Sequence, residues 1–378
     1  MADTLTTTTL RDLAAFRSEA GCAVSLYLDL DPADTPTPAS VDARVNSLLS
    51  DAEKRFAARR EELGHDERVT LKRDFERLRD FFDVDFDRDG ARGYAVFVSA
   101  DFWHEVALPG SVHDQVTIGP AFSVGQLAAH LGRGDGAIVA FVGREKGQLF
   151  RLRGGRLQEV VDLTEDQPGR HDQGGWSQAR YQRHIEKLVG EHLRDVAAEL
   201  DRAVHRLRAP KVVVVGSEET RAEFLDTLTE DVKAAVVGTT EAEAHAGPNE
   251  LLEVVQPLIE EARAHDEHAA LERWREEAAK DGRAASGWAE TLEAASDARV
   301  EVLLYEEGAD TEAHECPQCG RASLEAGECP LDAATFERRE SGFDLAVQRT
   351  VANGGTLLAV RHQVDLGPVG GVGALLRF

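Results

Sequence analysis

The sequence predicts an α/β protein of three domains, and three observations support this prediction. Its 378 residues exceed what one ordinary core accommodates, so two or three domains are expected. Hydrophobic residues make up 42% of the chain and charged residues 30%, which is the balance of a globular protein that folds in water. Segments with helical spacing of apolar residues alternate with short valine-rich runs such as KVVVV, which are typical of strands buried in a parallel or mixed sheet.

The first domain is expected to be an α/β domain over residues 1–132. The alternation of Val24, Leu26 and Leu28 predicts a strand, and apolar residues at helical spacing predict two charged helices near 41–63 and 67–82. GYAVFVSADFWHEVALP and DQVTIG supply three more strands. The turn-forming segment LGRGDG then marks the boundary.

The second domain is expected over residues 133–265. Three strands separate at GREKGQ and RGG, and a loop and a long helix near 177–207 follow. KVVVVGS and VKAAVVGT are two further strands, joined by a helix near 219–229. A meander that feeds a β-α-β unit resembles the RNase H-like architecture. The strands GAIVAFV and KVVVVG carry no acidic residue, which disfavours the nuclease activity often found on that fold.

The third domain is expected over residues 266–378 as a small α/β/α sandwich. An acidic amphipathic helix near 249–280, kinked at Pro257, leads into it. GWAETLEAASDARVEVLLYEE reads as a helix and a strand, and a cysteine-bearing insertion at 314–332 follows. FDLAVQRTVANGG is a helix with a glycine stop, TLLAVRHQV is a strand, and GGVGALLRF ends in another strand.

Charge and composition exclude several classes of protein. The net charge of -26 disfavours indiscriminate nucleic-acid binding, so any RNA contact must be local, and no DNA partner is expected. No apolar run is long enough for a bilayer, and MADTLTTTTLRDL lacks the features of a signal peptide. We therefore expect a cytoplasmic protein without a membrane partner. The stretch from Arg144 to Lys187 contains nine Lys and Arg and seven Asp and Glu, so it is a weakly basic island in an acidic chain.

The basic island ends in an unusual loop and helix start, GGWSQARYQRHIEKL. Gly174 and Gly175 permit backbone conformations that other residues avoid. Two amides, Gln173 and Gln178, flank Trp176, and the helix behind them carries three cationic residues: Arg180, Arg183 and Lys187. Such a loop is either a solvated connector or a tip that reaches a partner.

This stretch resembles the Gly-Gly-Gln loop of archaeal and eukaryotic peptide-chain release factors. Matching positions of their GGQS-x-x-R-F-x-R pattern are Gly174, Gly175, Ser177, Arg180, Tyr181 and Arg183. GRAASGWAETLEAASDARVEVLLY and the terminal GGVGALLRF are similar to the kink-turn-binding, ribosomal-protein-like third domain that these factors share with the rescue factor Pelota. By this resemblance the chain is identified as a bacterial member of the archaeo-eukaryotic release factor superfamily, related also to the peptidyl-tRNA hydrolase of eukaryotic ribosome quality control.

The resemblance implies a ribosome-dependent function, with ribosomal RNA and peptidyl-tRNA as partners and a translational GTPase as a possible delivery factor. The loop at 174–178 would enter the A site and promote release of peptidyl-tRNA, with Gln178 displaced from the usual glutamine place that Trp176 occupies. Alternatively, Trp176 stacks on a ribosomal RNA base and Arg180 and Arg183 pair with phosphates, which suits a hibernation factor without hydrolysis. The first domain shows no motif for reading stop codons.

The cysteine insertion has the spacing of a zinc knuckle. Cys316 and Cys319 form a C-x-x-C pair, and Cys329 stands in CPLD nine residues later, so that Asp332 holds the place of a fourth cysteine. His314 is the rival fourth ligand. Some release-factor relatives carry a zinc-bearing mini-domain here, and we expect structural zinc, although a loop that has lost its metal would show the same remnants. Cys22, beside the first strand, is expected to be a buried apolar residue.

Overall fold

The computed structural model is a mixed α/β structure with four β-sheets in the part of the chain that it describes. It describes residues 3–18, 22–58, 64–88, 90–108, 110–131, 136–153, 155–164, 177–207, 210–362 and 366–378, with the backbone alone for residues 3, 4, 7 and 177–185. The chain divides into two compact units. The larger unit combines residues 1–132 with 267–378, and the smaller unit holds residues 133–266.

The first sheet of the larger unit has the strand order β1-β4-β3-β2-β5. Its alternating strands bury both faces: Leu26 and Val96 pack on one side against α2 (Pro38–Ala58) and α3 (His65–Asp80). Tyr27 and Phe97 face α1 (Thr7–Ala15) and α4 (Gly125–Leu131) on the other side. The strands are β1 (Asp3–Thr4), β2 (Ala23–Asp29), β3 (Gly93–Ser99), β4 (Phe102–Leu108) and β5 (Gln115–Gly119).

The second sheet of the larger unit lies in the C-terminal part and has the order β11-β17-β12-β16. Helices α9 (Gly287–Ser296) and α10 (Gly342–Ala352) contribute Leu292 and Leu345 to the core on one face. Leu271 and Trp274, in the second half of α8 (Pro248–Ala278), pack on the other face. The strands are β11 (Ala284–Ser286), β12 (Val300–Glu306), β16 (Thr356–Val360) and β17 (Val372–Leu376). This is the predicted α/β/α sandwich.

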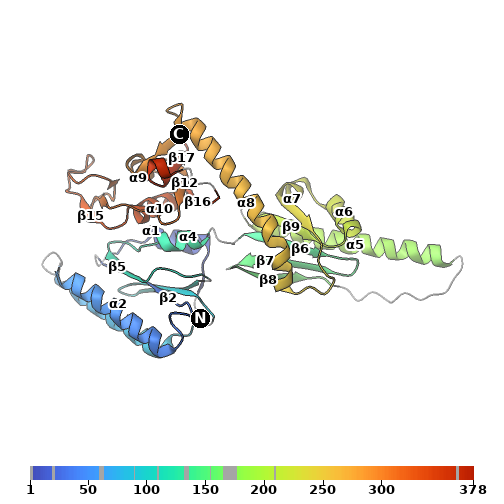
Figure 1. Cartoon of the computed structure of the whole chain (residues 1–378), viewed down its shortest axis with the longest axis horizontal. Coiled ribbons are helices and arrows are strands. Elements are labelled where there is room, and N and C mark those ends of the chain that lie inside the picture. Colours follow the sequence, from blue (N-terminus) through green and yellow to red (C-terminus); the bar gives the residue numbers. More distant parts are fainter. Residues whose placement is uncertain are drawn as a thin grey trace. The chain divides into compact units, whose positions relative to one another are not determined.

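One apolar core joins these two parts of the larger unit. It contains Leu10 and Leu13 of α1, Phe122 before α4, and Leu345 of α10. Helices α1, α4, α9 and α10 therefore form a middle layer between the two sheets (Figure 1). The sequence predicts these two parts as separate domains, whereas the structure packs them into one compact unit. The predicted domain boundaries themselves stay predictions, since one compact unit can hold two domains.

The smaller unit holds a five-stranded sheet with the order β10-β9-β6-β7-β8. β6, β7 and β8 form an antiparallel meander, and β9 and β10 continue the sheet in parallel with β6. This is the RNase H-like arrangement that the sequence predicts. The strands are β6 (Ala137–Val142), β7 (Gly147–Arg153), β8 (Arg156–Asp162), β9 (Lys211–Val215) and β10 (Val236–Thr240).

Helices cover both faces of this sheet, which explains its valine-rich strands. Helices α5 (Ser177–Arg206), α6 (Glu218–Thr227) and α7 (Glu230–Ala235) pack on one face, where Val212 and Val214 are buried. The first half of α8 packs on the other face with Leu251, Val255 and Ile259. The helix α8 continues through Pro257 without a break in its assignment.

The sequence misassigned or missed some short elements. The segment VKAA, predicted as the start of a strand, ends α7, and the strand begins only at Val236. A helical start is favoured here because Thr229 precedes an acidic first turn with Glu230 and Asp231. A small sheet with the order β14-β13-β15, which extends the insertion to residues 313–339, was not predicted, and neither were β11 and α4. Its strands are β13 (Ala313–Glu315), β14 (Ala322–Ser323) and β15 (Glu337–Arg339).

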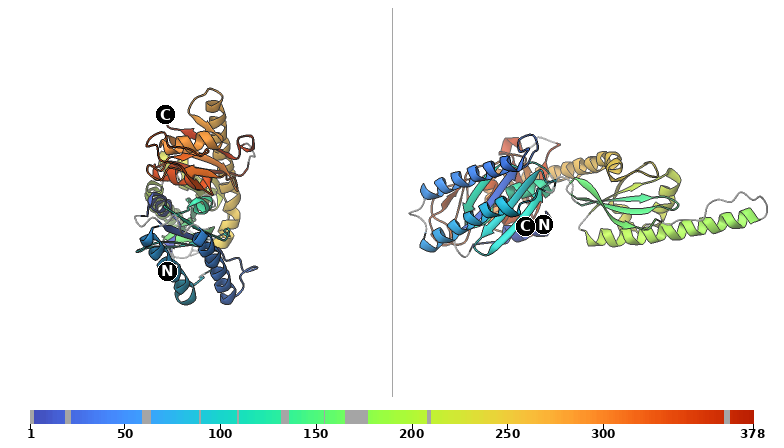
Figure 2. Two further views of the ribbon diagram at one scale, coloured as in Figure 1. Left: turned by 90° about the vertical axis from the view of Figure 1, so that its left-hand side faces the viewer. Right: turned by 90° about the horizontal axis from the view of Figure 1, so that it is seen from below.

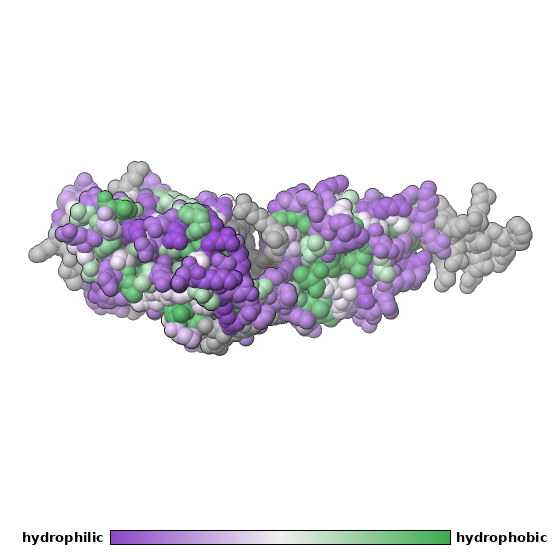
Figure 3. Space-filling model, turned by 90° about the horizontal axis from the view of Figure 1, so that it is seen from above, coloured by the Kyte–Doolittle hydropathy of each residue, from purple (hydrophilic) through white to green (hydrophobic). Residues whose placement is uncertain are grey.

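The described residues contain no helix that is both long and apolar enough to span a membrane. Figure 3 shows that hydrophilic residues cover most of the drawn surface, with apolar side chains gathered mainly over the smaller unit. The surface thus agrees with the high charge of the sequence.

Candidate functional site

Helix α5 is the element that follows the glycine-rich loop. Val189, Leu193, Val196 and Leu200 recur at helical spacing and are buried against the sheet. Gly147 allows this close approach, because a Cβ there would lie 2.5 Å from Cγ2 of Val196. The N-terminal part of α5 extends beyond the sheet, as Figure 2 (right) shows. Packing therefore anchors the C-terminal two thirds of the helix and leaves its start beyond the sheet edge.

The predicted loop residues fall at this N-terminal end. Gly174, Gly175 and Trp176 lie outside the described residues. Gln178 is in the first turn of α5, and Arg180 and Arg183 follow in the helix, with only their backbones described. The positive end of the α5 dipole points toward this end of the helix, which favours anionic groups nearby.

Lys187 is the first predicted RNA-binding residue whose side chain is described. It is exposed, and its Nζ lies 3.4 Å from Oε1 of Glu191, one turn along the helix. Such an exposed pair contributes little to stability. The charge of Lys187 is therefore available to a polyanion that competes for it with Glu191.

The four predicted metal ligands lie together. The Sγ atoms of Cys316, Cys319 and Cys329 and a carboxylate oxygen of Asp332 are all within 4.8 Å of one another. Both carboxylate oxygens of Asp332 are 3.3 Å from Sγ of Cys316. His314 is not a member of this group among the described residues. The structure thus favours Asp332 over His314 as the fourth ligand.

The backbone explains how Asp332 reaches this place. The N–H of Gly320 donates to the carbonyl of Cys316, and the N–H of Ala333 donates equally to the carbonyl of Cys329, both at 2.9 Å. Gly320 and Ala333 also share the left-handed conformation, with φ of 72° and 62°. The insertion therefore contains two copies of one turn, in which Asp332 takes the position that Cys319 holds in the first copy.

The donor set fits a tetrahedral zinc ion. Sulfur ligands at about 2.3 Å from zinc lie roughly 3.8 Å apart in a tetrahedron. The Sγ atoms of Cys319 and Cys329 are 3.5 Å apart, close to this separation. Three thiolates with one carboxylate form a set that zinc accepts.

The pKa values of three of these four side chains are shifted from their ordinary values. Burial raises the pKa of Cys316, but the N–H groups of Cys319 and Gln318 outweigh it and bring the pKa below its ordinary value. Desolvation, together with hydrogen bonds to Asp332 and Cys329, raises the pKa of Cys319 to about 12. A hydrogen bond from Cys319 and the N–H of Ala334 lower the pKa of Asp332. The carboxylate is thus ionised and ready to act as a ligand.

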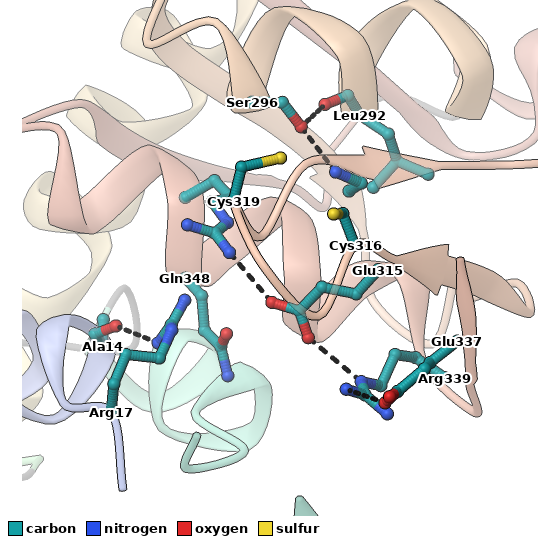
Figure 4. A network of polar contacts seen from close by, with 12 residues as sticks. Ala14, Arg17, Leu292, Ser296, Glu315, Cys316, Cys319, Glu337, Arg339 and Gln348 are labelled. Carbon is teal, nitrogen blue, oxygen red and sulfur yellow. Dashed lines mark hydrogen bonds and ion pairs between the residues drawn. The ribbon is translucent and has the colours of Figure 1, made fainter. Parts of the chain in front are cut away.

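Buried ion pairs anchor the insertion to the sandwich, which the sequence alone did not reveal. Glu315, before the first ligand, accepts from Nη2 of Arg349 at 2.8 Å and from Nε of Arg339 at 3.0 Å (Figure 4). Arg321, after the first turn, donates to Glu293 of α9 and to Asp297, the residue that follows this helix. The signal in the sequence is that charged residues flank the CPQC motif on both sides.

Comparison with known proteins finds similarity over the segment that holds the loop and α5. Residues 123–263 match the model of Bacterial archaeo-eukaryotic release factor family 10. The chain is 31% identical over 215 residues to the Peptide chain release factor subunit 1 of Methanopyrus kandleri, which covers 54% of this chain and 51% of that protein. It is 24% identical over 269 residues to the same factor of Thermococcus kodakarensis, covering 63% and 65% of the two chains. The chain thus spans about half to two thirds of these relatives.

Two solved structures are similar over most of their length at 17% identity. An archaeal translation termination factor gives a TM-score of 0.29, covering 99% of both chains. The Pelota protein of Archaeoglobus fulgidus gives 0.33, covering 99% of this chain and 93% of that one. At these TM-scores the likeness by itself decides neither fold nor function.

Proposed function

Since this chain belongs to the superfamily of archaeo-eukaryotic release factors and Pelota, we propose that it is a ribosome-associated release or rescue factor. The observation that carries the proposal is the family match over residues 123–263, which includes the glycine-rich loop and α5. The similarity to two archaeal release factors extends over 54% and 63% of this chain. Its substrate would be peptidyl-tRNA on stalled ribosomes.

In this proposal, α5 presents the loop at 174–178 to the peptidyl transferase centre from the A site. Ester hydrolysis needs a positioned water and donors for the developing negative charge. Gly174 and Gly175 would let the backbone take the required conformation, and the amide of Gln178 would help to orient water. The ribosome would supply most of the catalytic environment. Arg180, Arg183 and Lys187 would pair with phosphates of ribosomal RNA.

Trp176 favours a second candidate function, because it stands where release factors have the catalytic glutamine. An aromatic side chain can stack on an exposed RNA base. A loop that binds in this way without hydrolysis would make the chain a hibernation or protection factor that occupies the A site of idle ribosomes.

A release assay separates these two functions. Peptidyl-tRNA release from stalled ribosome complexes is compared between the wild type, Gln178→Ala and Gln182→Ala, the last being a control on the same helix outside the matching motif. A hydrolytic loop predicts that Gln178→Ala loses on the order of 100-fold in release rate, as removal of one transition-state donor does, and that the control keeps its rate. Ribosome co-sedimentation without release by the wild type would instead establish the non-hydrolytic function.

The cysteine insertion would hold a structural zinc ion through Cys316, Cys319, Cys329 and Asp332. When bound, zinc would contribute folding free energy and no chemistry of the release reaction. Purified protein should contain close to one equivalent, and less than about half an equivalent would contradict the site. Asp332→Cys should retain the metal, because it completes a four-cysteine set in the second turn, whereas Asp332→Ala should lose it.

The remaining partners follow from the superfamily and stand as proposals. A translational GTPase would deliver the chain to the ribosome, and the site of action would be the cytoplasm. Co-sedimentation with ribosomes in the presence and absence of the GTP-bound factor tests the first of these.

A further inference from the structure

The metal-binding insertion forms part of the core that joins the N-terminal and C-terminal parts of the larger unit. Ala313 of β13 (Ala313–Glu315) and Ala322 of β14 (Ala322–Ser323) are 0% and 3% exposed. Both belong to the apolar cluster that contains Leu13 of α1 and Leu345 of α10. The insertion therefore contributes side chains to this core and is not a peripheral loop.

Polar contacts fix the insertion on α10. Glu315 is buried, precedes the predicted ligand Cys316 and accepts one hydrogen bond from Arg349 of α10. A Cβ at Gly320, within the first metal-binding turn, would overlap the guanidinium of Arg349. The N–H of Ala322 also donates to Oγ of Ser296, which in turn donates to the carbonyl of Leu292 in α9 (Figure 4). These contacts fix the position of the Cys316–Gly320 turn relative to helix α10.

The same helix α10 holds the N-terminal part of the unit. The N–H of Gly125 donates to Oδ1 of Asp344 at 2.5 Å, and the hydroxyl of Ser123 donates to its Oδ2. The amide of Gln348 donates to the carbonyl of Phe122. Gln348 is the chain neighbour of Arg349, so contacts to the N-terminal part and to the metal-binding turn leave α10 from adjacent residues.

We propose that metal binding at Cys316, Cys319, Cys329 and Asp332 acts as a clasp that stabilises the joint between residues 1–132 and 267–378, with α10 as the transmitting helix. The proposal rests on the metal site put forward above. Without the ion, three sulfurs and a carboxylate have no common partner, and the two turns lose their main constraint. Glu315 then no longer holds Arg349 in place, and the contacts of the adjacent Gln348 to the N-terminal part weaken.

Hydrogen exchange of the full chain, read by mass spectrometry, tests the clasp. Protein loaded with Zn²⁺ is compared with chelator-treated protein at the same pH. The probes are residues 7–15 and 116–131 of the N-terminal part, and the internal reference is residues 137–142 and 211–215 of the smaller unit. Metal removal should speed exchange in both probes on the order of tenfold, a usual size of coupling between sites, and leave the reference unchanged.

Two variants identify the transmitting contact. Arg349→Met should keep close to one equivalent of zinc while the metal-dependent change in the probes falls below about twofold, because coupling requires the contact. Arg338→Gln is the matched control: Arg338 pairs with Glu312 in an exposed part of the same insertion, so the metal-dependent change should persist. If Arg349→Met does not fold, Arg349→Gln provides the same comparison, because it also removes the charge that pairs with Glu315.

The outcomes separate the clasp from the metal site. Bound zinc whose removal changes exchange only within residues 313–339 would overturn the clasp and leave the metal site standing. Absence of bound zinc in the purified protein would overturn both. An unchanged response in Arg349→Met would also overturn the assigned route through α10.

Discussion

The cysteine insertion and the N-terminal end of α5 carry the two predicted sites, and they differ in how much of the site the protein builds by itself. In the insertion, the donor atoms of the four predicted ligands lie within 4.8 Å of one another, and buried ion pairs through Glu315 hold this group on the sandwich. At the start of α5, the described packing begins only at Val189, after an exposed Lys187.

This difference indicates what completes each site. A structural metal site must be closed and supported from within, and the insertion meets that requirement. A loop that works on a ribosome needs only an anchored helix to carry it, because the partner supplies the remaining groups. Changes in the insertion should therefore affect stability first, and changes on α5 should affect binding first.

The largest stability effect is expected for Glu315→Gln. Glu315 is 4% exposed and faces two arginines, so its loss leaves two charges without their buried partner. We expect the free energy of unfolding to fall by about 3 kcal/mol, measured by urea unfolding. Glu312→Gln is the control, because the ion pair of Glu312 with Arg338 is exposed to solvent. This substitution should change the free energy of unfolding by less than about 0.5 kcal/mol. If both substitutions lowered the free energy of unfolding equally, the buried ion pairs of Glu315 would not stabilise the protein more than the exposed pair of Glu312.

On α5, the double substitution Arg180→Gln with Arg183→Gln should weaken ribosome binding and leave stability nearly unchanged. The plot of log affinity against log salt concentration has a negative slope, and each lost phosphate contact should reduce the magnitude of this slope by about 1. Co-sedimentation across a salt series measures this slope. Arg202→Gln, farther along the same helix where Arg202 pairs with Glu199, should leave the slope unchanged. An unaltered slope in the double variant would remove these arginines from the binding surface.

The sequence was a good guide to elements whose signals are local. Helix α5 was expected near 177–207 and spans Ser177–Arg206, because its apolar spacing and its flanking loop are written in one stretch. The turn copies around Cys316 and Cys329 were likewise readable as a C-x-x-C and a C-x-x-D motif, and their four side chains do lie together.

Long-range packing could not be predicted in this way. Ala313 is buried in the same core as α1, about 300 residues away in the sequence, and this depends on the association of two sheets that no local pattern records. The partners of Glu315 are arginines of β15 (Glu337–Arg339) and α10, which are distant in the sequence. The presence of a glutamate at position 315 therefore did not indicate that its side chain is buried. The role of the loop at 174–176 stays a prediction.

Asp344, in α10, makes the stability of the larger unit depend on pH. Burial raises the pKa of this carboxyl, which the bonds from Ser123 and the N–H of Gly125 only partly offset. The folded protein therefore binds this proton more tightly than the unfolded chain does. The stability that the proton contributes is complete below the ordinary carboxyl pKa and is lost as pH rises through the raised pKa. Urea unfolding across pH should show that Asp344→Asn flattens this decline relative to the wild type. A parallel pH profile in the variant would contradict the assignment.

The smallest stability effect is expected for Lys187→Gln. The pair with Glu191 is exposed, so the free energy of unfolding should change by less than about 0.5 kcal/mol. Ribosome affinity should nevertheless fall in this variant and not in Glu191→Gln, which breaks the same pair without removing a positive charge. A matching loss of affinity in both would mean that the pair matters for the helix and not for RNA.

The most direct test of the central claim is electron cryomicroscopy of the full chain bound to ribosomes stalled with peptidyl-tRNA. We predict that the smaller unit enters the A site, with residues 174–178 at the peptidyl transferase centre and the side chains of Arg180 and Arg183 at RNA phosphates. A complex in which the start of α5 faces solvent, or in which the chain does not bind, would contradict the account.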